Sequence, residues 1–109
     1  MKKTSIQIKI KGCSFDHRQE HLRWLKTHPQ AIAWLEREKN SPFDPNAIRV
    51  MISQNGQPCH IGYIDRTLAI TLAPIMDHGK AITIDNLKII GGENNKHFGC
   101  LANITWINS

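Results

Sequence analysis

A stiff turn in the middle of the chain holds the residues best suited to recognition chemistry. It places an aromatic ring, Phe43, beside a carboxylate, Asp44, with Pro42 and Pro45 on either side. Each proline fixes its own φ and biases the residue before it toward an extended conformation. The ring and the carboxylate are therefore held at a set angle, as in a small binding site on a rigid scaffold. The same residues also suit a structural turn, in which Asp44 caps the backbone and Phe43 fills the edge of the core.

A histidine pair near the N-terminus matches a metal-binding pattern. His17 and His21 flank Glu20 in the order H-x-x-E-H, which on a helix places two imidazoles one turn apart, as in a class of zinc proteases. Such enzymes need a further acidic ligand on a large catalytic domain, and this chain is short and shows no partner helix. The spacing also suits the half-buried edge of a helix that continues to Leu25 and His28. We therefore expect no metal and no cofactor.

The sequence lacks the other signatures of catalysis. It contains no glycine-rich phosphate loop, no nucleophilic serine turn and no telling cysteine and histidine spacing. We therefore expect no catalytic residue and no enzyme activity. A small metal-dependent hydrolase or nuclease is the least favoured alternative, since it would need Asp44 to converge with Asp65 or Asp77, and these residues belong to separate elements.

Composition bounds the partner and the compartment. The 109 residues suffice for one domain, 1–109, with its own core. A formal net charge of +5 favours an anionic partner, and nucleic acid is the commonest candidate. The three cysteines, Cys13, Cys59 and Cys100, are far apart and indicate reduced thiols. Because no apolar segment approaches the length of a membrane span and the N-terminus does not read as a signal peptide, we expect a cytoplasmic protein.

Hydrophobic periodicity predicts six short strands. They are expected at about residues 4–11, 31–38, 47–52, 58–64, 82–90 and 98–107, and the pattern of 31–38 is equally compatible with a helix. Asn55-Gly56 is a strong hairpin signal between the third and fourth strands. Gly62 suggests a bulge or a close approach to another backbone. A second bulge is expected near Asp85 and Asn86, where the apolar residues of the fifth strand change face.

Two helices are predicted between these strands. The first spans residues 16–27, with Asp16 as N-cap and Gln19 three residues later, as in a capping box. The second follows Asp65 as N-cap, contains Pro74 and ends before Gly79. Together the elements indicate a mainly β fold, an OB-like or SH3-like small barrel or bent sheet of about six mostly antiparallel strands with two inserted α-helices.

Several ordered motifs resemble the HIRAN domain family over nearly the whole chain. They are Gly12 with Phe15 and Arg18; Arg37-Glu38 followed by Pro42-Phe43-Asp44-Pro45-Asn46-Ala47-Ile48-Arg49-Val50; Ile61-Gly62-Tyr63-Ile64; and Leu68-Ala69 with Leu72-Ala73-Pro74. The resemblance implies an OB-like β-barrel with two helices that binds DNA. In fork-remodelling helicases, a module of this family captures the 3′ end of single-stranded DNA.

The resemblance also implies which residues contact DNA. It points to four aromatic rings and one carboxylate, Phe15, Phe43, Asp44, Tyr63 and Phe98, and the basic residues Arg18, Arg37 and Arg66 are expected to hold phosphates. Bases stack on aromatic faces, and a carboxylate repels a continuing phosphate backbone but accepts a hydrogen bond from a free hydroxyl. Asp44 therefore favours a strand terminus. Ser14, Ser41 and Phe43 depart from the family's usual Arg, Asn and Tyr, which bears on affinity more than on the fold.

We thus expect a monomeric DNA-binding module that recognises single-stranded DNA or a 3′ end and delivers it to a separate helicase or nuclease. The alternative is a protein-interaction module that docks onto a DNA-processing enzyme through Trp34, Trp106 or an exposed strand edge. This alternative predicts an apolar patch over the pocket in place of a basic rim.

Overall fold

Six antiparallel strands form two sheets in the computed structural model, which describes residues 2–94 and 96–108. One sheet has the order β1-β6-β5, with β1 at Lys2–Lys9, β5 at Ile82–Gly91 and β6 at Phe98–Asn108. The other has the order β2-β3-β4, with β2 at Ala33–Arg37, β3 at Ile48–Gln54 and β4 at Gln57–Tyr63. The helices are α1, Asp16–Thr27, and α2, Arg66–Asp77. The predicted mainly β class with two inserted helices is confirmed.

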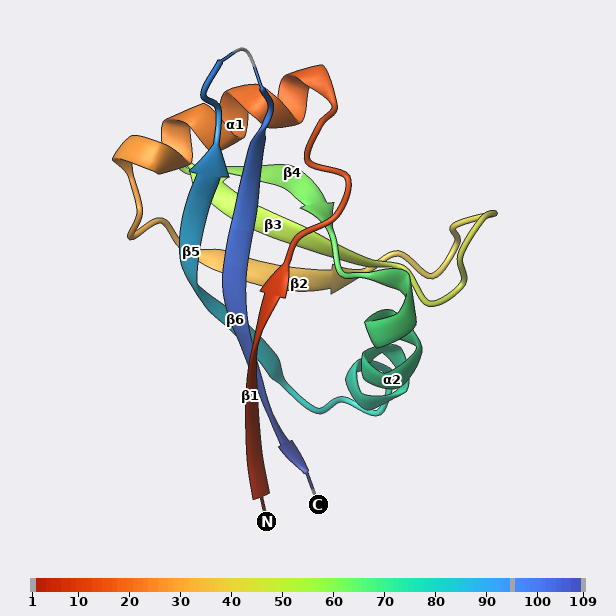
Figure 1. The fold of residues 1–109 in the computed structure, drawn as a ribbon. Helices are drawn as coiled ribbons and strands as arrows, with labels where there is room; N and C mark the ends of the chain where they lie inside the picture. Colours follow the sequence, from red (N-terminus) through yellow and green to blue (C-terminus); the bar gives the residue numbers. More distant parts are fainter. Residues whose placement is uncertain (1, 95, 109) are drawn as a thin grey trace.

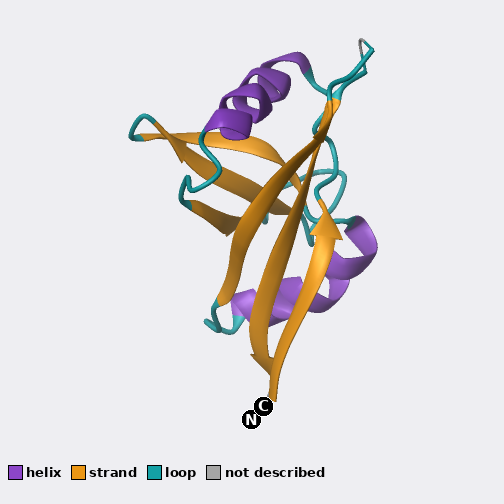
Figure 2. Ribbon diagram, turned by 60° about the vertical axis from the view of Figure 1, so that its left-hand side comes forward, coloured by secondary structure: helices purple, strands orange, loops and turns teal. Residues whose placement is uncertain are grey.

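The two sheets face each other with their strands crossing, and the hydrophobic core lies between them (Figures 1 and 2). α1 lies across one end of the sheets, and α2 lies to one side, near the loop between β2 and β3. A two-residue bridge joins the sheets, in which Lys11 and Tyr63 exchange backbone hydrogen bonds of 2.8 and 2.9 Å. The core therefore closes where the segment that precedes Phe15 and Arg18 meets the segment that contains Tyr63.

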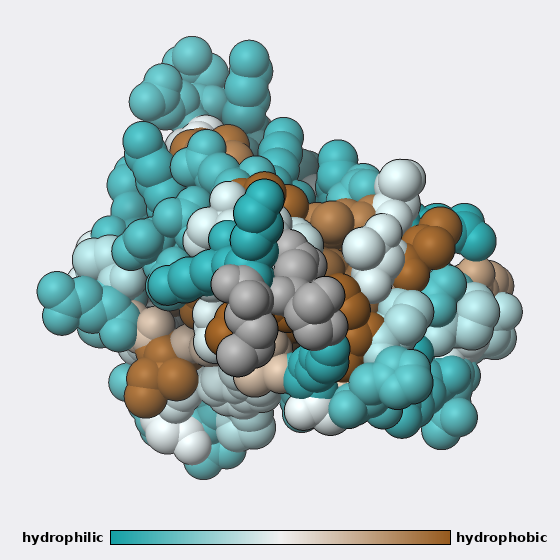
Figure 3. Space-filling model, turned by 90° about the horizontal axis from the view of Figure 1, so that it is seen from below, coloured by the Kyte–Doolittle hydropathy of each residue, from teal (hydrophilic) through white to brown (hydrophobic). Residues whose placement is uncertain are grey.

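Alternating burial accounts for the strands. In β1, Ile6 and Ile8 turn toward the core and are half-buried, while Ser5 and Gln7 are exposed. The ambiguous segment is a strand, β2, and its buried Leu35 pairs with Val50 of β3. Seen from the end that carries the termini, the surface is mostly hydrophilic with separate apolar areas (Figure 3). No helix within the described residues has the length and apolarity that a membrane crossing requires.

The turn and bulge predictions are confirmed. Asn55 and Gly56 have φ of 52° and 80°, as a tight hairpin between β3 and β4 requires. Opposite Gly62 the register of β3 shifts by one residue between Val50 and Met51. A Cβ on Gly62 would lie 2.5 Å from the Lys11 carbonyl oxygen, so the glycine is needed where the sheets meet. The fifth strand shifts register after Asp85, as predicted.

The helix starts confirm one predicted cap and correct the other. Asp65 caps α2, and its carboxylate accepts a hydrogen bond of 3.1 Å from the Thr67 backbone N–H. The prediction of Asp16 as N-cap was wrong, because Phe15 occupies that position and its side chain offers no acceptor. Gln19 does not complete a capping box. Its amide instead donates to the Phe98 carbonyl at 3.0 Å and accepts from the Phe98 N–H at 2.8 Å, fastening α1 to β6.

Candidate nucleic-acid interface

The turn that joins β2 to β3 is fastened at its base by Arg37. The guanidinium donates to the Ala47 carbonyl through Nη1 at 2.6 Å and to the Pro45 carbonyl through Nη2 at 2.9 Å. It also donates to both carboxylate oxygens of Asp77, the last residue of α2, at 3.0 and 3.2 Å. These bonds hold the pKa of the Asp77 carboxyl below its usual value, with the Arg37 hydrogen bond as the largest cause. The loop thus projects from a fixed base.

Within the loop, Asp44 has a structural role and an unused oxygen. Its Oδ1 accepts a hydrogen bond of 2.9 Å from the Asn46 backbone N–H, and its own N–H donates to the Ser41 hydroxyl at 3.2 Å. Oδ2 makes no hydrogen bond with any residue that the structure describes. The structural interpretation of the turn is therefore correct for Asp44 and wrong for Phe43, whose ring is 86% exposed and does not fill the core.

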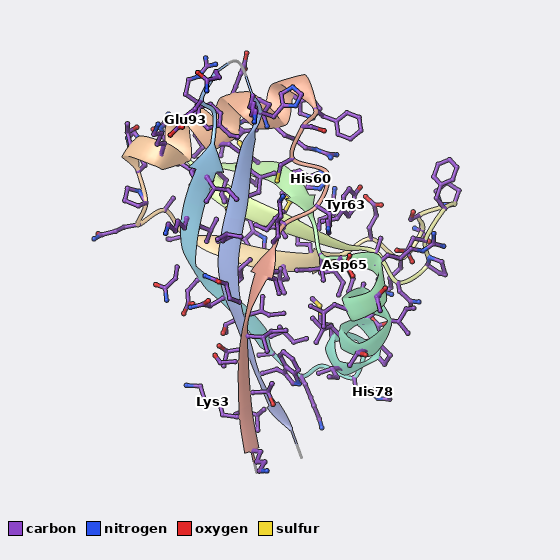
Figure 4. The ribbon with its side chains drawn as sticks, in the orientation of Figure 1. Lys3, His60, Tyr63, Asp65, His78 and Glu93 are labelled. Carbon is purple, nitrogen blue, oxygen red and sulfur yellow. The ribbon has the colours of Figure 1, made fainter. Side chains whose placement is uncertain are left out.

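A pocket of about 760 Å³ opens beside this loop. Its walls are mostly apolar and comprise loop residues 40–44, Glu38 and Ala47 at the loop base, Lys11 and Tyr63 of the sheet bridge, and residues 64–66 at the start of α2. Figure 4 shows Tyr63 and Asp65 on the side of the molecule from which the loop projects. The pocket is thus built where the two sheets, the loop and α2 converge.

The pocket rim carries charges of both signs. Lys11 and Arg66 provide two cations, while Glu38, Asp44 and Asp65 provide three carboxylates. Neither the basic rim expected of a DNA site nor the apolar patch expected of a docking surface describes it fully. A pocket of this balance disfavours a bound phosphate group and suits a neutral group that can donate hydrogen bonds.

Tyr63 forms the wall of the pocket at the sheet bridge. Its hydroxyl donates to Glu38 at 3.0 Å, and its ring lies perpendicular to the His60 ring with a centroid distance of 4.7 Å. Burial, followed by the Glu38 hydrogen bond, raises the pKa of the Tyr63 phenol. Burial, followed by the charge of Arg18, lowers the pKa of His60. The Tyr63 wall is therefore held by the Glu38 carboxylate, which accepts from its hydroxyl, and by the His60 ring, which packs against its own ring.

Arg18 links the Tyr63 wall to the first loop. Its guanidinium carbon lies 4.7 Å from the centre of the Phe15 ring and 5.5 Å from that of the Tyr63 ring, within cation–π range. Its Nη1 also donates to the Gly12 carbonyl at 2.8 Å. The Phe15 ring remains 59% exposed. Arg18 thus positions the exposed Phe15 ring next to the Tyr63 wall of the pocket.

A second hollow of about 400 Å³ lies on the other side of Lys11. Lys9, Lys11 and His97 line it, together with Phe98, and its walls contain no Asp or Glu among the described residues. Lys26 of α1 lies 5.7 Å from the centre of the Phe98 ring. Because Lys11 lines both hollows, they form one continuous surface. Its charged side chains are of both signs in the pocket and are only cations in the second hollow.

The eight predicted site residues divide into three groups. Phe43, Asp44, Tyr63 and Arg66 line the pocket; Phe15, Arg18 and Phe98 lie along the path to the second hollow; and Arg37 lies beneath the loop, with its side chain only 10% exposed. The sequence reasoning missed Glu38 and His60. Glu38 contacts a residue 25 positions away, and nothing in its spacing indicated that contact.

The alternative sites receive less support from the geometry. The described residues contain no group of His, Cys, Asp or Glu arranged to hold a metal ion. His21 of the histidine motif forms a hydrogen bond of 2.6 Å with Gln54. Trp106, one of the two tryptophans considered for protein docking, is 8% exposed and belongs to the core.

The fold and the surface define a small mainly β module with an open aromatic cleft. The chain belongs to the HIRAN domain family, whose model matches residues 3–104, and this family is known for DNA binding. The crystal structure of a Lactobacillus plantarum protein is similar with a TM-score of 0.60 and 19% identity, covering 97% of this chain and 100% of the other. That likeness concerns the fold alone. No curated protein matches the chain.

Proposed function

We propose that this domain binds single-stranded DNA at a 3′ end, with the terminal nucleotide in the pocket beside Asp44. The observation that supports the proposal most is the unused Oδ2 of Asp44 on the wall of a pocket that also presents Phe43 and Tyr63. The 3′ hydroxyl of a terminal deoxyribose can donate to a carboxylate oxygen, whereas an internal phosphate brings a negative charge against it. The site therefore favours an end over an internal position.

The change of charge along the surface supports a direction for the strand. The pocket holds three carboxylates against two cations, and the second hollow holds cations without carboxylates. Phosphates are attracted to the second hollow, where Lys9 and Lys11 neutralise them. The strand would thus run from Phe98, past Phe15 and Arg18, into the pocket with its 3′ end last. Stacking on Phe98, Phe15 and Phe43 would be largely independent of sequence.

Fluorescence polarisation with three oligonucleotides of equal length tests this proposal. One ends in a 3′ hydroxyl, one in a 3′ phosphate, and the third is a closed circle without ends. We expect the hydroxyl end to bind tightest and the other two to bind about tenfold or more weakly, since a charge-assisted hydrogen bond contributes roughly 1.5–3 kcal/mol. Equal affinity for all three would refute end recognition, and no binding at low salt would refute DNA binding.

Substitution of Asp44 sharpens the test. Asp44→Asn keeps the acceptor for the Asn46 N–H but removes the charge, so the preference for the hydroxyl over the phosphate end should shrink while the fold persists. Asp85→Asn is the matched control, because Asp85 is an exposed carboxylate in β5 that does not line the pocket. An Asp44→Asn protein with an unchanged end preference would remove Asp44 from the mechanism.

A further inference from the structure

The outer edge of β1 lies outside the pocket beside Asp44 and shares only Lys9 with the second hollow. β1 is the end strand of its sheet and pairs with β6 along its whole length, from Lys2 with Asn108 to Lys9 with Leu101. On its other side, the described residues offer no strand partner until the bridge at Lys11. Figure 1 shows β1 at the margin of its sheet, with β6 on one side of it. Among the described residues, the outer side of β1 thus has no strand partner at Lys3, Ser5, Gln7 and Lys9.

The pairing pattern shows which backbone groups face outward. The Ile10 N–H donates to the Cys100 carbonyl of β6, whereas Lys11 exchanges both of its backbone bonds with Tyr63 on the opposite side. Main-chain groups of an antiparallel strand alternate between its two sides. The outward-pointing N–H and C=O groups are therefore those of Lys3, Ser5, Gln7 and Lys9. They point to the same side of the strand as the Lys11 groups that bond to Tyr63 of β4.

The two faces of this edge differ in chemistry. Lys3, Ser5, Gln7 and Lys9 are exposed on one face, and Figure 4 shows Lys3 on the lower part of β1. Their partners in β6, Ile107, Thr105, Asn103 and Leu101, are uncharged. On the other face Ile6 and Ile8 are only half-buried. A strand added here would lie beside lysine side chains on one face and beside the half-buried side chains of Ile6 and Ile8 on the other.

We propose that the β1 edge binds an extended peptide in which acidic and apolar residues alternate. Backbone hydrogen bonds would pair the peptide with Ser5 and Gln7, its acidic side chains would lie beside Lys3 and Lys9, and its apolar side chains would cover Ile6. This is strand addition, in which the main chain supplies affinity and alternate side chains supply specificity. The site lies outside the DNA pocket, shares only Lys9 with the second hollow, and does not depend on the proposed DNA specificity.

Charge argues against a second copy of the chain that pairs about Ile6 as the occupant. Two β1 strands that paired about a two-fold axis at Ile6 would place Lys3 of one copy opposite Lys9 of the other, twice over. Directly opposed like charges destabilise an antiparallel pair. An acidic strand in the same position converts both contacts into attractive ones.

Titration of the isotope-labelled protein with a capped peptide of eight residues, alternating valine and glutamate and matched in length to β1, tests the proposal by amide NMR. We expect shifts concentrated at residues 3–9 and slower hydrogen exchange at the outward amides of Ser5 and Gln7, while amides of the DNA pocket stay unchanged. A peptide alternating valine and lysine should bind about tenfold or more weakly, because its charges repel Lys3 and Lys9.

Proline at an outward-facing position provides the matched variant pair. Gln7→Pro removes one outward N–H without touching the bonds to β6 and should abolish binding, whereas Gln7→Ala should retain it. Equal binding of both peptides, shifts at the pocket alone, or a dimer with protected Ser5 and Gln7 amides would each overturn the proposal. So would shifts of the same edge produced by single-stranded DNA and not by the peptide. Hydrogen exchange on the unmodified chain decides the matter even where Gln7→Pro does not fold.

Discussion

Arg37 and Asp77 join the end of β2 to the end of α2, with the guanidinium Nε and Nη2 donating to the two carboxylate oxygens at 3.0 and 3.2 Å. The same guanidinium donates to the carbonyls of Ala47 and Pro45. The loop that carries Phe43 is therefore positioned by a residue that does not itself line the pocket. This arrangement separates the residues that hold the loop from those that would contact DNA.

Arg37→Ala should lower the melting temperature and the DNA affinity together. Loss of its hydrogen bonds leaves the loop base unsupported, which we expect to cost about 1–3 kcal/mol of unfolding free energy. Calorimetry and fluorescence polarisation measure the two effects. Lys39→Ala is the control, since Lys39 is 65% exposed and reaches Asp77 only at 3.7 Å. A loss of affinity at unchanged stability would instead make Arg37 a direct DNA contact.

The Arg37 and Asp77 pair should also show in the pH dependence of stability. Because the folded pKa of Asp77 lies below its ordinary value of 3.8, the pair stabilises the protein above that value, and the contribution disappears as pH falls through the folded pKa. Asp77→Asn should therefore be less stable than the unmodified chain at neutral pH, with the difference closing in acid. Urea unfolding across this range measures it, and a difference that persists in acid contradicts the assignment.

Tyr63 should ionise at higher pH than a free tyrosine. It is the single tyrosine of the sequence, so the phenolate absorbance reports it without ambiguity. Its pKa is raised above 10.0 by burial and by the Glu38 hydrogen bond. Glu38→Gln should lower the pKa toward 10.0 but leave the part caused by burial. Glu36→Gln is the control, because Glu36 lies two residues before Glu38 in the sequence, and it should leave the Tyr63 pKa unchanged. Equal shifts of the Tyr63 pKa in both variants would rule out the Glu38 contact.

Gly62→Ala should be among the most damaging small substitutions. Its Cβ would lie 2.5 Å from both Ile10 Cγ2 and the Lys11 carbonyl oxygen, and backbone cannot easily move there. We expect a loss of about 2–4 kcal/mol of unfolding free energy, measured by chemical denaturation. Gly99→Ala is the control, because its nearest neighbour is the flexible Ile90 side chain at 3.2 Å. Equal effects at the two glycines would show that the sheet bridge tolerates displacement.

Phe43→Ala should weaken DNA binding without changing stability. The ring is 86% exposed, so little core packing is lost, while loss of a base stack costs about 1–3 kcal/mol, or roughly 5-fold to 150-fold in affinity. Ile70→Ala removes another exposed apolar side chain, on α2 and away from the pocket, and should leave affinity unchanged. If both variants bind as the unmodified chain does, Phe43 has no part in binding.

Much of the fold could be predicted from local patterns. Apolar and polar side chains alternate along its strands, and its turns contain residues that tolerate the backbone conformation required there. The hairpin at Asn55-Gly56, the cap at Asp65 and the close approach at Gly62 all follow from one residue and its neighbours. The prediction of Asp16 as N-cap failed because the capping-box pattern depends on residue spacing and takes no account of contacts with distant strands. Gln19 has better partners on β6, 79 residues away.

The site was less predictable, since it depends on contacts between distant segments. Spacing placed Phe43 and Asp44 on a stiff loop, but it could not show that Arg37 lies beneath that loop, nor that Glu38 accepts from Tyr63 across 25 positions. The charge balance of the pocket likewise emerges only when three carboxylates meet, from Asp44 in the loop, Glu38 just after β2 and the N-cap Asp65 of α2.

We expect the bridge between Lys11 and Tyr63 to couple ligand binding in the pocket to the closure of the fold. Their main chains join the two sheets, and their side chains line the pocket. A ligand that contacts both side chains and binds only the closed form stabilises that form by thermodynamic linkage. Occupation of the pocket should consequently slow hydrogen exchange of the Lys11 and Tyr63 amides, so that the stability of the barrel itself reports the ligand.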